Sequence, residues 1–199
     1  MSSTIRLATE HDADQIRAIY APFCDDSSPT SFEIQAPDVD EMRRRVAKTL
    51  AQHPWLVCDR DGETLGFVYA GTHRERAAYA WSVDVSVYVR DGLRRSGIGR
   101  ALYTSLFQAL RLQGYYNAFA GITLPNPGSV GLHEALGFEP VGTYRNVGYK
   151  GGRWHDVAWW RLPLLDPAPA PAPPIALPAA RLLDGWESAL ASGMPWLRV

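Results

Sequence analysis

The chain has 199 residues, enough for one main domain with a smaller addition but too few for two domains of full size. Apolar residues make up 46% and charged residues 21%, which can form a buried core and excludes disorder throughout the chain. The formal net charge of −1 gives no general attraction for nucleic acid or an anionic membrane, so local groups must bind any anionic ligand.

The cysteines and the distribution of apolar residues indicate the cellular compartment of the chain. Cys24 and Cys58 are the only cysteines and form no C-x-x-C pair, so the sequence indicates neither a disulfide scaffold nor a thiolate zinc site. Charged residues precede any apolar stretch of signal-peptide length, and no run of about 18 apolar residues occurs. We therefore expect a reduced chain in the cytoplasm, with no membrane and no nucleic-acid partner.

The first half of the chain alternates between strand-like and helix-like segments. Strands are predicted at residues 4–7, 55–59, 64–72 and 78–89, and helices from Thr9 to about Phe23 and from Asp38 to before His53. Thr9 and Asp12 have the spacing of a helix-capping pair. The Asp61-Gly62 pair is a strong hairpin signal, so the second and third strands are expected to pair.

The second half continues this alternation. The segment at residues 90–99 leads into a helix that ends at Gly114, and another helix runs from about Pro127 to Gly137. Further strands are predicted at residues 118–123, 143–147 and 157–162. The sequence therefore predicts an α/β domain without internal repeats, over residues 1–165.

The composition changes abruptly near residue 163. Residues 163–178 carry seven of the 15 prolines, which favours an extended spacer without a core of its own. Beyond the spacer, Leu182, Trp186 and Leu190 recur at helical spacing, with Leu183 beside them. We expect residues 166–199 to form a Pro/Ala-rich linker and a short amphipathic helix, which docks either on this domain or on a second subunit.

The turn Arg94-x-x-Gly97-x-Gly99 lies between the long strand and a well-patterned helix. At a helix N-terminus backbone N–H groups point outward, and glycines allow a pyrophosphate to approach the main chain. The same pattern also fits a surface loop without a ligand. The third glycine of a dinucleotide fingerprint and the G-x-x-x-x-G-K-[ST] motif are both missing, which disfavours a Rossmann or P-loop nucleotide site.

Four motifs in order resemble those of a known family. They are Val87-Tyr88-Val89, Arg94-x-x-Gly97-x-Gly99, Asn126, and the run from His133 to Phe138. Together they resemble the GNAT superfamily of acetyl-CoA-dependent N-acetyltransferases. The stretches SVYV, LPNPGSVGLHEALGF and GYKGGRWHDV further resemble the phosphinothricin N-acetyltransferase group, which includes methionine sulfoximine and sulfone acetyltransferases. The resemblance covers roughly residues 4–165.

The resemblance implies a fold and a cofactor. The expected fold is α/β (α+β), with a central mixed, mostly antiparallel sheet flanked by helices and a proline-rich C-terminal extension. Acetyl-CoA is the expected cofactor, with Val87 and Val89 pairing through their backbone with its pantetheine arm. Its expected binding residues are Val87, Tyr88, Val89, Arg94, Arg95, Ser96, Gly97, Ile98, Gly99, Arg100, Asn126 and Ser129. Asn126 also fits a turn that starts a helix.

Two residues are implied to be catalytic. Asp84 stands where the family has a glutamate regarded as the general base, and it is one methylene shorter, so a bridging water or a deeper substrate is needed. Asp84 also fits the polar face of a strand whose valines alternate with it. His133 corresponds to a family histidine near the reacting centre, as a base, a thiolate proton donor or an orienting group. A packed helix histidine is the alternative.

Acceptors of this group are small amines, glutamate-like amino acids whose side chains end in oxygen-rich groups, which arginine forks bind well. Phe32, Arg74, Arg76 and Tyr79 correspond to substrate-binding positions, although the arginine segment also fits a solvated loop. We expect no metal, because Trp154-His155-Asp156 has no third ligand nearby in sequence. The resemblance also implies a homodimer.

The leading hypothesis is direct acetyl transfer from acetyl-CoA to the α-amine of such an amino acid. Cys24 and Cys58 are interpreted as structural, because neither has an identified base partner. One alternative is a GNAT enzyme with another acceptor, such as a protein N-terminus, a lysine, a polyamine or another drug. The other is a non-catalytic acetyl-CoA-binding sensor.

Overall fold

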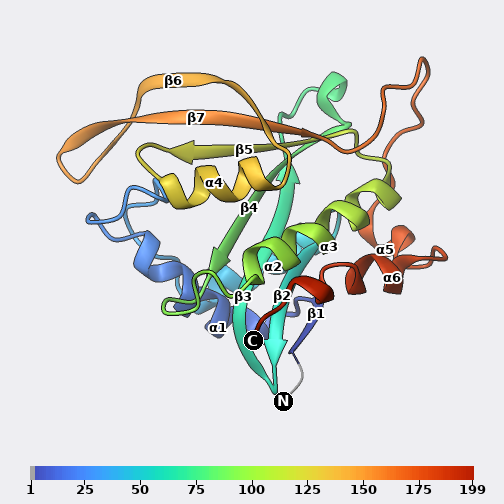
Figure 1. The fold of residues 1–199 in the computed structure, drawn as a ribbon, viewed down its shortest axis with the longest axis horizontal. Helices are drawn as coiled ribbons and strands as arrows, with labels where there is room; N and C mark the ends of the chain where they lie inside the picture. The colour runs from blue at the N-terminus through green and yellow to red at the C-terminus, as the bar shows by residue number, and fades with distance from the viewer. Residues whose placement is uncertain (1–2) are drawn as a thin grey trace.

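The computed structural model describes residues 3–199 and contains one seven-stranded sheet in the order β1-β2-β3-β4-β5-β7-β6 (Figure 1). The strands are β1 (Ser3–Leu7), β2 (Trp55–Arg60), β3 (Glu63–Thr72), β4 (Ser82–Val89), β5 (Asn117–Thr123), β6 (Glu139–Lys150) and β7 (Arg153–Pro163). Neighbouring strands are antiparallel, except that β4 and β5 are parallel. The expected mixed, mostly antiparallel sheet is therefore confirmed.

Helices cover both faces of this sheet (Figure 1). They are α1 (Ala13–Tyr20), α2 (Val39–Leu50), α3 (Ile98–Gln113), α4 (Pro127–Ala135), α5 (Leu177–Ala180) and α6 (Trp186–Ala191). Short 3-10 helices occupy Glu10–Asp12, Ala21–Phe23, Ala77–Tyr79 and Met194–Trp196. Among the helices of residues 3–199, none has the length and apolar character needed to cross a membrane.

The helix boundaries follow the capping signals in the sequence. The backbone N–H of Thr9 donates to Oδ2 of Asp12 at 2.7 Å, as expected for a capping pair. Oδ1 of Asp38 accepts from the backbone N–H of Glu41 at 2.7 Å and so caps α2. Gly114 ends α3 with φ of +87°, a left-handed conformation that glycine adopts without strain. α2 and α3 therefore begin and end close to where they were predicted, whereas the helix expected from Thr9 to about Phe23 is α-helical only over α1, with a 3-10 helix on either side.

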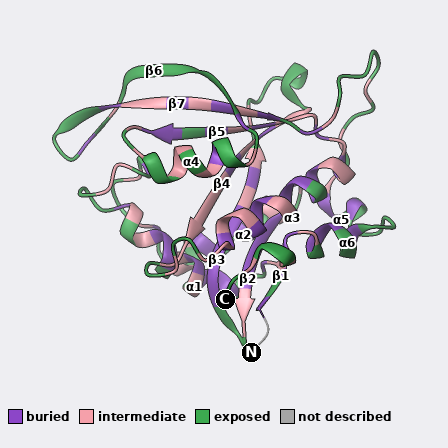
Figure 2. Ribbon diagram, in the orientation of Figure 1, coloured by how far each residue is buried: buried purple, intermediate pink, exposed green. Residues whose placement is uncertain are grey.

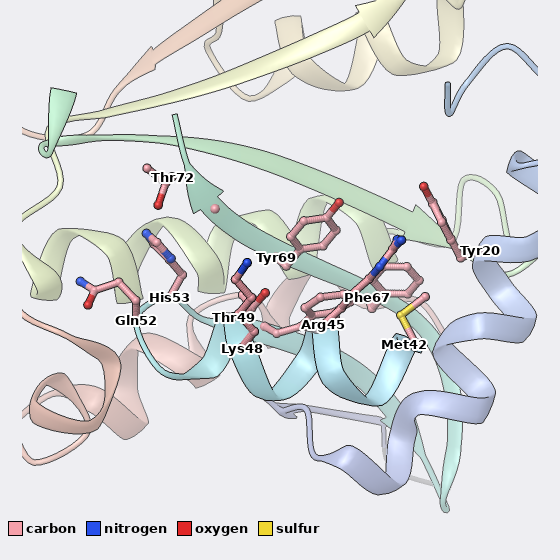
Figure 3. Close-up of a pocket in the computed structure, with 12 residues that line it drawn as sticks. Tyr20, Met42, Arg45, Lys48, Thr49, Gln52, His53, Phe67, Tyr69 and Thr72 are labelled. Atoms are coloured by element: carbon pink, nitrogen blue, oxygen red, sulfur yellow. The ribbon is translucent and has the colours of Figure 1, made fainter. Parts of the chain in front are cut away.

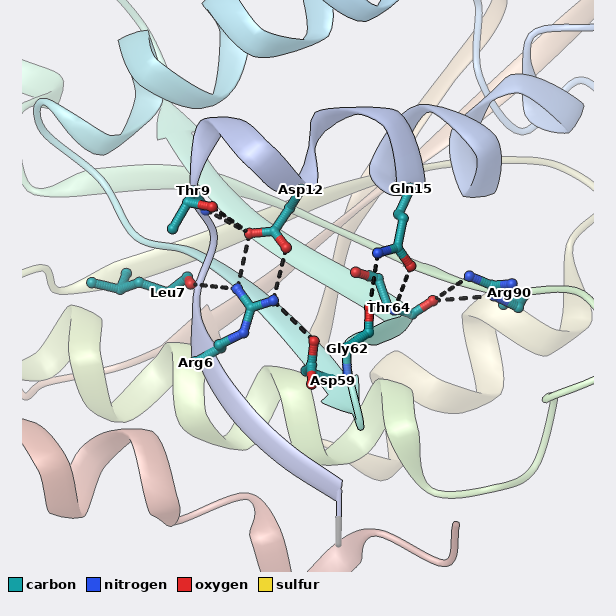
Figure 4. Close-up of polar contacts among 9 residues, drawn as sticks. All are labelled: Arg6, Leu7, Thr9, Asp12, Gln15, Asp59, Gly62, Thr64 and Arg90. Atoms are coloured by element: carbon teal, nitrogen blue, oxygen red, sulfur yellow. Dashed lines mark hydrogen bonds and ion pairs between the residues drawn. The ribbon is translucent and has the colours of Figure 1, made fainter. Parts of the chain in front are cut away.

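A polar network ties the first strand to the elements around it (Figure 4). Nη2 of Arg6 lies 2.7 Å from Oδ1 of Asp12 and 2.9 Å from Oδ2 of Asp59, linking β1 to the start of α1 and to β2. Oε1 of Gln15 accepts from the backbone N–H of Thr64 at 2.8 Å, which joins α1 to β3. The network fixes the start of α1 against β1, β2 and β3.

The alternation of side chains along β4 separates two faces with different partners. Val83 and Val85 are buried in the core that includes α3, whereas Phe67 of β3 belongs to a second core with α1 and α2. Gly71 of β3 pairs with Asp84, and antiparallel partners point to the same face. Asp84 therefore lies on the face of α1 and α2, opposite to α3.

The two parallel strands separate after a short contact. β4 and β5 pair only from Ser82 to Asp84 on one strand and from Asn117 to Phe119 on the other. Both strands continue beyond this point, and Figure 1 shows them diverging. The backbone of β4 from Val85 to Val89 is therefore left without a β5 partner, which positions the candidate site described below.

Three predicted segments differ in extent from the structure. The strand expected at residues 78–89 begins only at Ser82, because Ala77–Tyr79 forms a 3-10 helix. β6 and β7 are longer than the strands expected at residues 143–147 and 157–162. Most of β6 is exposed (Figure 2), so its side chains lack the alternating burial on which strand prediction depends.

The proline-rich extension leads back onto the folded domain. Leu177 and Trp186 are buried in the same core as α3, and Ser105 of α3 donates its hydroxyl proton to the carbonyl of Leu190 at 2.6 Å. The expectation of one amphipathic helix is wrong, because Gly185, with φ of +95°, separates the short helices α5 and α6. Leu182, one of the expected apolar positions, is 86% exposed between them.

Candidate functional site

A narrow cavity of about 60 Å³ lies where β4 and β5 separate. Its lining comes from the loop before α2, β4, α3, β5 and α4: Thr30, Val85, Ser86, Val87, Tyr88, Tyr103, Ala120, Gly121, Ile122, Thr123, Asn126, Ser129 and His133. The structure therefore gathers Val87, Tyr88, Asn126, Ser129 and His133, which the sequence assigned to cofactor binding and catalysis. An extended chain laid along the free edge of β4 would find unpaired N–H and C=O groups there.

The glycine-containing loop lies between β4 and α3, as predicted. Gly97 precedes α3 with φ of +82°, and the first-turn N–H groups of α3 have no acceptor within the helix. Together with the helix dipole, these groups favour an anion at this end of α3. Within residues 3–199, Arg94, Arg95 and Arg100 form no ion pair with a carboxylate. Their charges are available to a phosphate.

The end of the chain packs directly against this loop. The guanidinium of Arg100 lies 3.5 Å from the centroid of the Trp196 ring, and the backbone N–H of Arg198 donates to the carbonyl of Ser96 at 3.0 Å. The carbonyl of Trp196 occupies the space that a side chain at Gly97 would need. Sequence reasoning separated the extension from the loop and therefore missed Trp196.

Asn126 and Ser129 shape the start of α4. Oδ1 of Asn126 accepts from the backbone N–H of Ser129 at 3.1 Å, so Asn126 is the cap of this helix. Capping uses only the carbonyl oxygen of the side chain, and the amide group remains able to donate to a ligand. The two roles foreseen for Asn126, as a helix starter and as a cofactor ligand, are compatible in this geometry.

His133 is buried, and both of its ring nitrogens have partners. Nδ1 lies 2.8 Å from the carbonyl of Ser129, which can only accept, so Nδ1 carries the hydrogen. Nε2 then accepts from the hydroxyl of Tyr103 at 3.1 Å. Burial lowers the pKa of His133, so the ring is neutral near pH 7. The geometry supports a positioning role for His133, with Tyr103 as a buried hydroxyl beside the cavity.

Asp84 has a partner that the sequence did not reveal. Its Oδ1 lies 2.6 Å from Nδ1 of His73, the residue that follows β3. The ring of His73 stacks on Phe119 of β5 at 4.4 Å between centroids and contacts the edge of Trp159 at 6.1 Å. Burial raises the pKa of Asp84, while the hydrogen bond from His73 and the charge of Arg74 act in the opposite direction. The carboxylate therefore belongs to a fixed pair.

The four predicted substrate residues do not form one cluster. Tyr79 lies beside His73, with ring centroids 6.0 Å apart, and Arg74 lies over the ring of Trp159 at 5.6 Å. Arg76 is exposed in the same loop. Phe32 packs elsewhere, against Gly148 of β6 and at 6.1 Å from the ring of His155. The structure thus brings Arg74 and Tyr79 to the Asp84 side of the sheet and places Phe32 on the β6–β7 hairpin.

A larger pocket, of about 470 Å³, lies between α2 and β3 (Figure 3). Its floor includes Trp55 and Tyr69, whose rings stack at 4.4 Å, and Figure 3 shows Arg45 and Lys48 extending from α2 towards it. Gly71, the partner of Asp84 in the sheet, also lines the pocket. The pocket therefore adjoins the Asp84 side of the site, and no sequence motif indicated it.

The loop that contains Phe32 is held at both ends. Nζ of the buried Lys150 donates to the carbonyls of Phe23 and Ser31 at 3.2 and 2.7 Å, which ties the loop to the end of β6. On the other side, Glu33 forms an ion pair with Arg45 of α2. These contacts fix the loop between the hairpin and the larger pocket.

Neither the two cysteines nor the residue types that bind metals add a reactive group to this site. Burial raises the pKa of Cys58 to about 11, so its thiol is protonated at neutral pH. Cys24 is also buried. Within residues 3–199, no three His, Cys, Asp or Glu side chains lie close enough together to hold a metal ion.

Comparisons with known proteins show which family the chain belongs to. Residues 5–159 match the family model described as an acetyltransferase (GNAT) domain. A phosphinothricin N-acetyltransferase from Streptomyces viridochromogenes is 38% identical over 165 residues, 83% of this chain and 90% of that relative. An L-methionine sulfoximine/L-methionine sulfone acetyltransferase from Pseudomonas paraeruginosa is 37% identical over 171 residues, 84% of this chain and 97% of that relative. A Sinorhizobium meliloti phosphinothricin acetyltransferase, solved in complex with AcCoA, has a TM-score of 0.79 at 32% identity, covering 87% of this chain and 97% of that one.

Proposed function

Because the chain belongs to the GNAT acetyltransferase family, we propose that it moves the acetyl group of acetyl-CoA directly to the α-amine of a small glutamate-like amino acid. Phosphinothricin, methionine sulfoximine and methionine sulfone are the proposed acceptors, as the names of the relatives suggest. The observation that carries the proposal is the separation of β4 from β5, which opens a cavity lined by Val87, Asn126 and His133 among others. Acetyl-CoA supplies an activated acetyl thioester.

The residues of the cofactor half fit an extended thiol ester with a diphosphate at its far end. The unpaired backbone of Val87 and Val89 can bind the amides of a pantetheine arm as another strand would. The loop from Arg94 through Ser96, Gly97, Ile98 and Gly99 to Arg100, with Arg95, offers helix N–H groups and unpaired guanidinium groups to the pyrophosphate. Tyr88, Asn126 and Ser129 line the cavity between these parts.

The part of the site that binds the acceptor must remove a proton from its amine. An α-amino group is mostly protonated near neutral pH, and a protonated amine cannot attack the thioester. Asp84 is the proposed centre of this step, because it directly precedes the cavity-lining Val85 on β4 and its carboxylate faces away from α3. His133 is neutral and hydrogen-bonded to Tyr103. Its proposed role is to position the groups of the cavity wall beside the leaving thiolate of coenzyme A.

Arg74, Arg76 and Tyr79 lie in the loop beside Asp84 and are proposed to bind the oxygen-rich groups of the acceptor. The pocket between α2 and β3 has room for the end of the acceptor side chain, with Lys48 at its rim. Phe32, the fourth proposed substrate residue, lies apart from these three and packs against Gly148 of β6. The acceptor is therefore held from the face of the sheet opposite to the glycine loop.

A homodimer is part of the proposal, with the β6–β7 hairpin as its interface. The hairpin exposes large apolar side chains, a feature that commonly marks a protein contact. They are Val141, Tyr144, Val147, Tyr149 and Trp154. Light scattering at working concentration tests the dimer, and a monomeric mass would reject it.

Residues 1–165 are the proposed catalytic domain, and the extension is an addition that packs on it. The cytoplasm is the proposed location.

The proposed reaction is tested by measuring thiol release from acetyl-CoA. Phosphinothricin, methionine sulfoximine and methionine sulfone are compared with glutamate, lysine peptides and polyamines. Preferential turnover of the first three, with kcat/KM of at least about 10⁴ M⁻¹s⁻¹, supports the proposal. Faster turnover of another amine would reject these acceptors but keep the acetyltransferase, and cofactor binding without any turnover would indicate a sensor.

A further inference from the structure

The contact between His73 and Asp84 joins two segments that the sequence keeps apart. His73 follows β3 and Asp84 lies in β4, and their side chains meet at 2.6 Å between Nδ1 and Oδ1. The side chain of His73 is 11% exposed and that of Asp84 is 37% exposed. The histidine is therefore the inner member of the pair, and the carboxylate is the more open one.

The surroundings of His73 determine the orientation of its ring. One face stacks on Phe119 with an interplanar angle of 16°, and the rings of Tyr79 and Trp159 meet it edge-on at 67° and 79°. These contacts come from β5, from the loop before β4, and from β7. Such a cage leaves the imidazole little rotational freedom, so Nδ1 stays directed at Asp84.

The contact also determines which nitrogen is open. A carboxylate oxygen can only accept, so Nδ1 of a neutral His73 carries the hydrogen and Nε2 carries the lone pair. Nε2 has no hydrogen-bond partner within residues 3–199 and is not among the polar atoms that are fully buried without one. The pair therefore presents two free acceptor atoms, Nε2 of His73 and Oδ2 of Asp84.

We propose that His73 and Asp84 deprotonate the acceptor as a unit, in which the carboxylate binds the ammonium group and Nε2 of the imidazole takes its proton, directly or through one water molecule. This inference rests on the proposed function. The N–H bond of the ammonium breaks and an N–H bond forms on Nε2, so the pair changes from a charge of −1 to neutral. The second proton, which the nitrogen loses after it attacks the thioester, goes to the leaving thiolate. His73 then releases the first proton from Nε2 to solvent.

The arrangement explains how a side chain one methylene shorter than glutamate serves at this position. The imidazole adds reach to the carboxylate, and an imidazole is a stronger base than a carboxylate. Asp84 holds the ring in one tautomer and stabilises the imidazolium that forms, as the aspartate of a hydrolase triad does. The two residues therefore divide binding and proton transfer between them.

Other charged groups near the pair do not replace this function. Arg74 is positive and lies over Trp159, and Arg161 on β7 donates to Oδ1 of Asn117 at 2.8 Å. Tyr69 of β3 is buried, which raises its pKa and keeps the phenol protonated. Tyr79 is a phenol at the edge of His73, while Phe119 and Trp159 carry no charge.

The test is the pH dependence of acetyl transfer by His73→Gln, followed by thiol release between pH 6 and 10. Glutamine can still donate to Asp84 but cannot take the proton. We expect kcat/KM to fall by about 100-fold or more near neutral pH, the size of a general-base contribution. The loss should shrink as the pH approaches the pKa of the acceptor ammonium, because the free amine then forms without help. Acetyl-CoA affinity should stay within error, and Tm should fall by a few degrees at most, because the ring that stacks on Phe119 is lost.

The controls separate this inference from the proposed function. His11→Gln changes an exposed histidine in the 3-10 helix before α1 and should behave as wild type. Wild-type kcat/KM in His73→Gln, or a loss of equal size at every pH, would overturn the inference and leave the acetyltransferase intact. A wild-type protein that acetylates no amine would overturn both. Asp84→Asn should also lose activity and, unlike His73→Gln, should bind the acceptor more weakly.

Discussion

Replacing Trp186 with alanine should destabilise the whole domain, although Trp186 lies beyond the residues that match the family model. Its side chain is 4% exposed and packs in one core with Leu102 and Leu106 of α3. Truncation of a buried tryptophan costs about 3–5 kcal/mol, from lost burial and from the cavity that remains. In a domain of this size about 2–4 °C of Tm is lost per kcal/mol, so Tm should fall by about 6–20 °C.

Urea unfolding of Trp186→Ala measures this loss, with Leu182→Ala as the matched control. Leu182 comes from the same extension but is 86% exposed, and exposed substitutions change stability by less than about 0.5 kcal/mol. If both variants unfold at the wild-type urea concentration, the extension does not belong to the cooperative unit. That result would refute the packing argument.

Three other perturbations test local features of the structure. Trp196→Ala should raise the KM for acetyl-CoA, because Arg100 loses the ring that orders it. The expected rise is about 2- to 30-fold, which corresponds to a cation–π contact of about 0.5–2 kcal/mol. An unchanged KM would contradict this role. Burial acts to raise the pKa of Asp12, but hydrogen bonds from Arg6 and Thr9 outweigh it and hold the pKa below its ordinary value. Wild type should therefore lose stability as the pH falls through that lowered pKa, and Asp12→Asn should lose less between pH 7 and 3 in urea unfolding; equal losses would argue against the ion pair. Cys58, with a pKa raised to about 11 by burial, should resist iodoacetamide at pH 8 in the folded protein and react in urea, as mass spectrometry can show; modification of the folded protein at the same rate would contradict its burial.

The sequence predicted those parts of the fold that local signals control. Asp38 caps α2, Gly114 ends α3, and the hairpin at Asp61-Gly62 pairs β2 with β3, because each depends on residues close together in the chain. The 3-10 helix at Ala77–Tyr79 was missed because an element of three residues is too short to show a periodic pattern. The length of β6 was missed because an exposed hairpin has no periodic burial.

The candidate site could be predicted only in part, for a related reason. Val87, Tyr88, Asn126, Ser129 and His133 belong to motifs and so could be placed at the cavity, but their partners come from elsewhere in the chain. His73 meets Asp84, and Tyr103 meets His133, only after the strands and helices have packed. Trp196 reaches Arg100 only because the extension folds back on α3. Contacts of this kind leave no local pattern.

The separation of β4 from β5 has a consequence for aggregation and for ligand-linked stability. A strand with free N–H and C=O groups is ordinarily a hazard, because a strand from another molecule can add to it. Here the free edge of β4 lies in a cleft of about 60 Å³ between other elements, which excludes a second sheet and admits only a slender ligand. A ligand that pairs with this edge should stabilise the native state by about 2.7 kcal/mol at a concentration of 100 Kd.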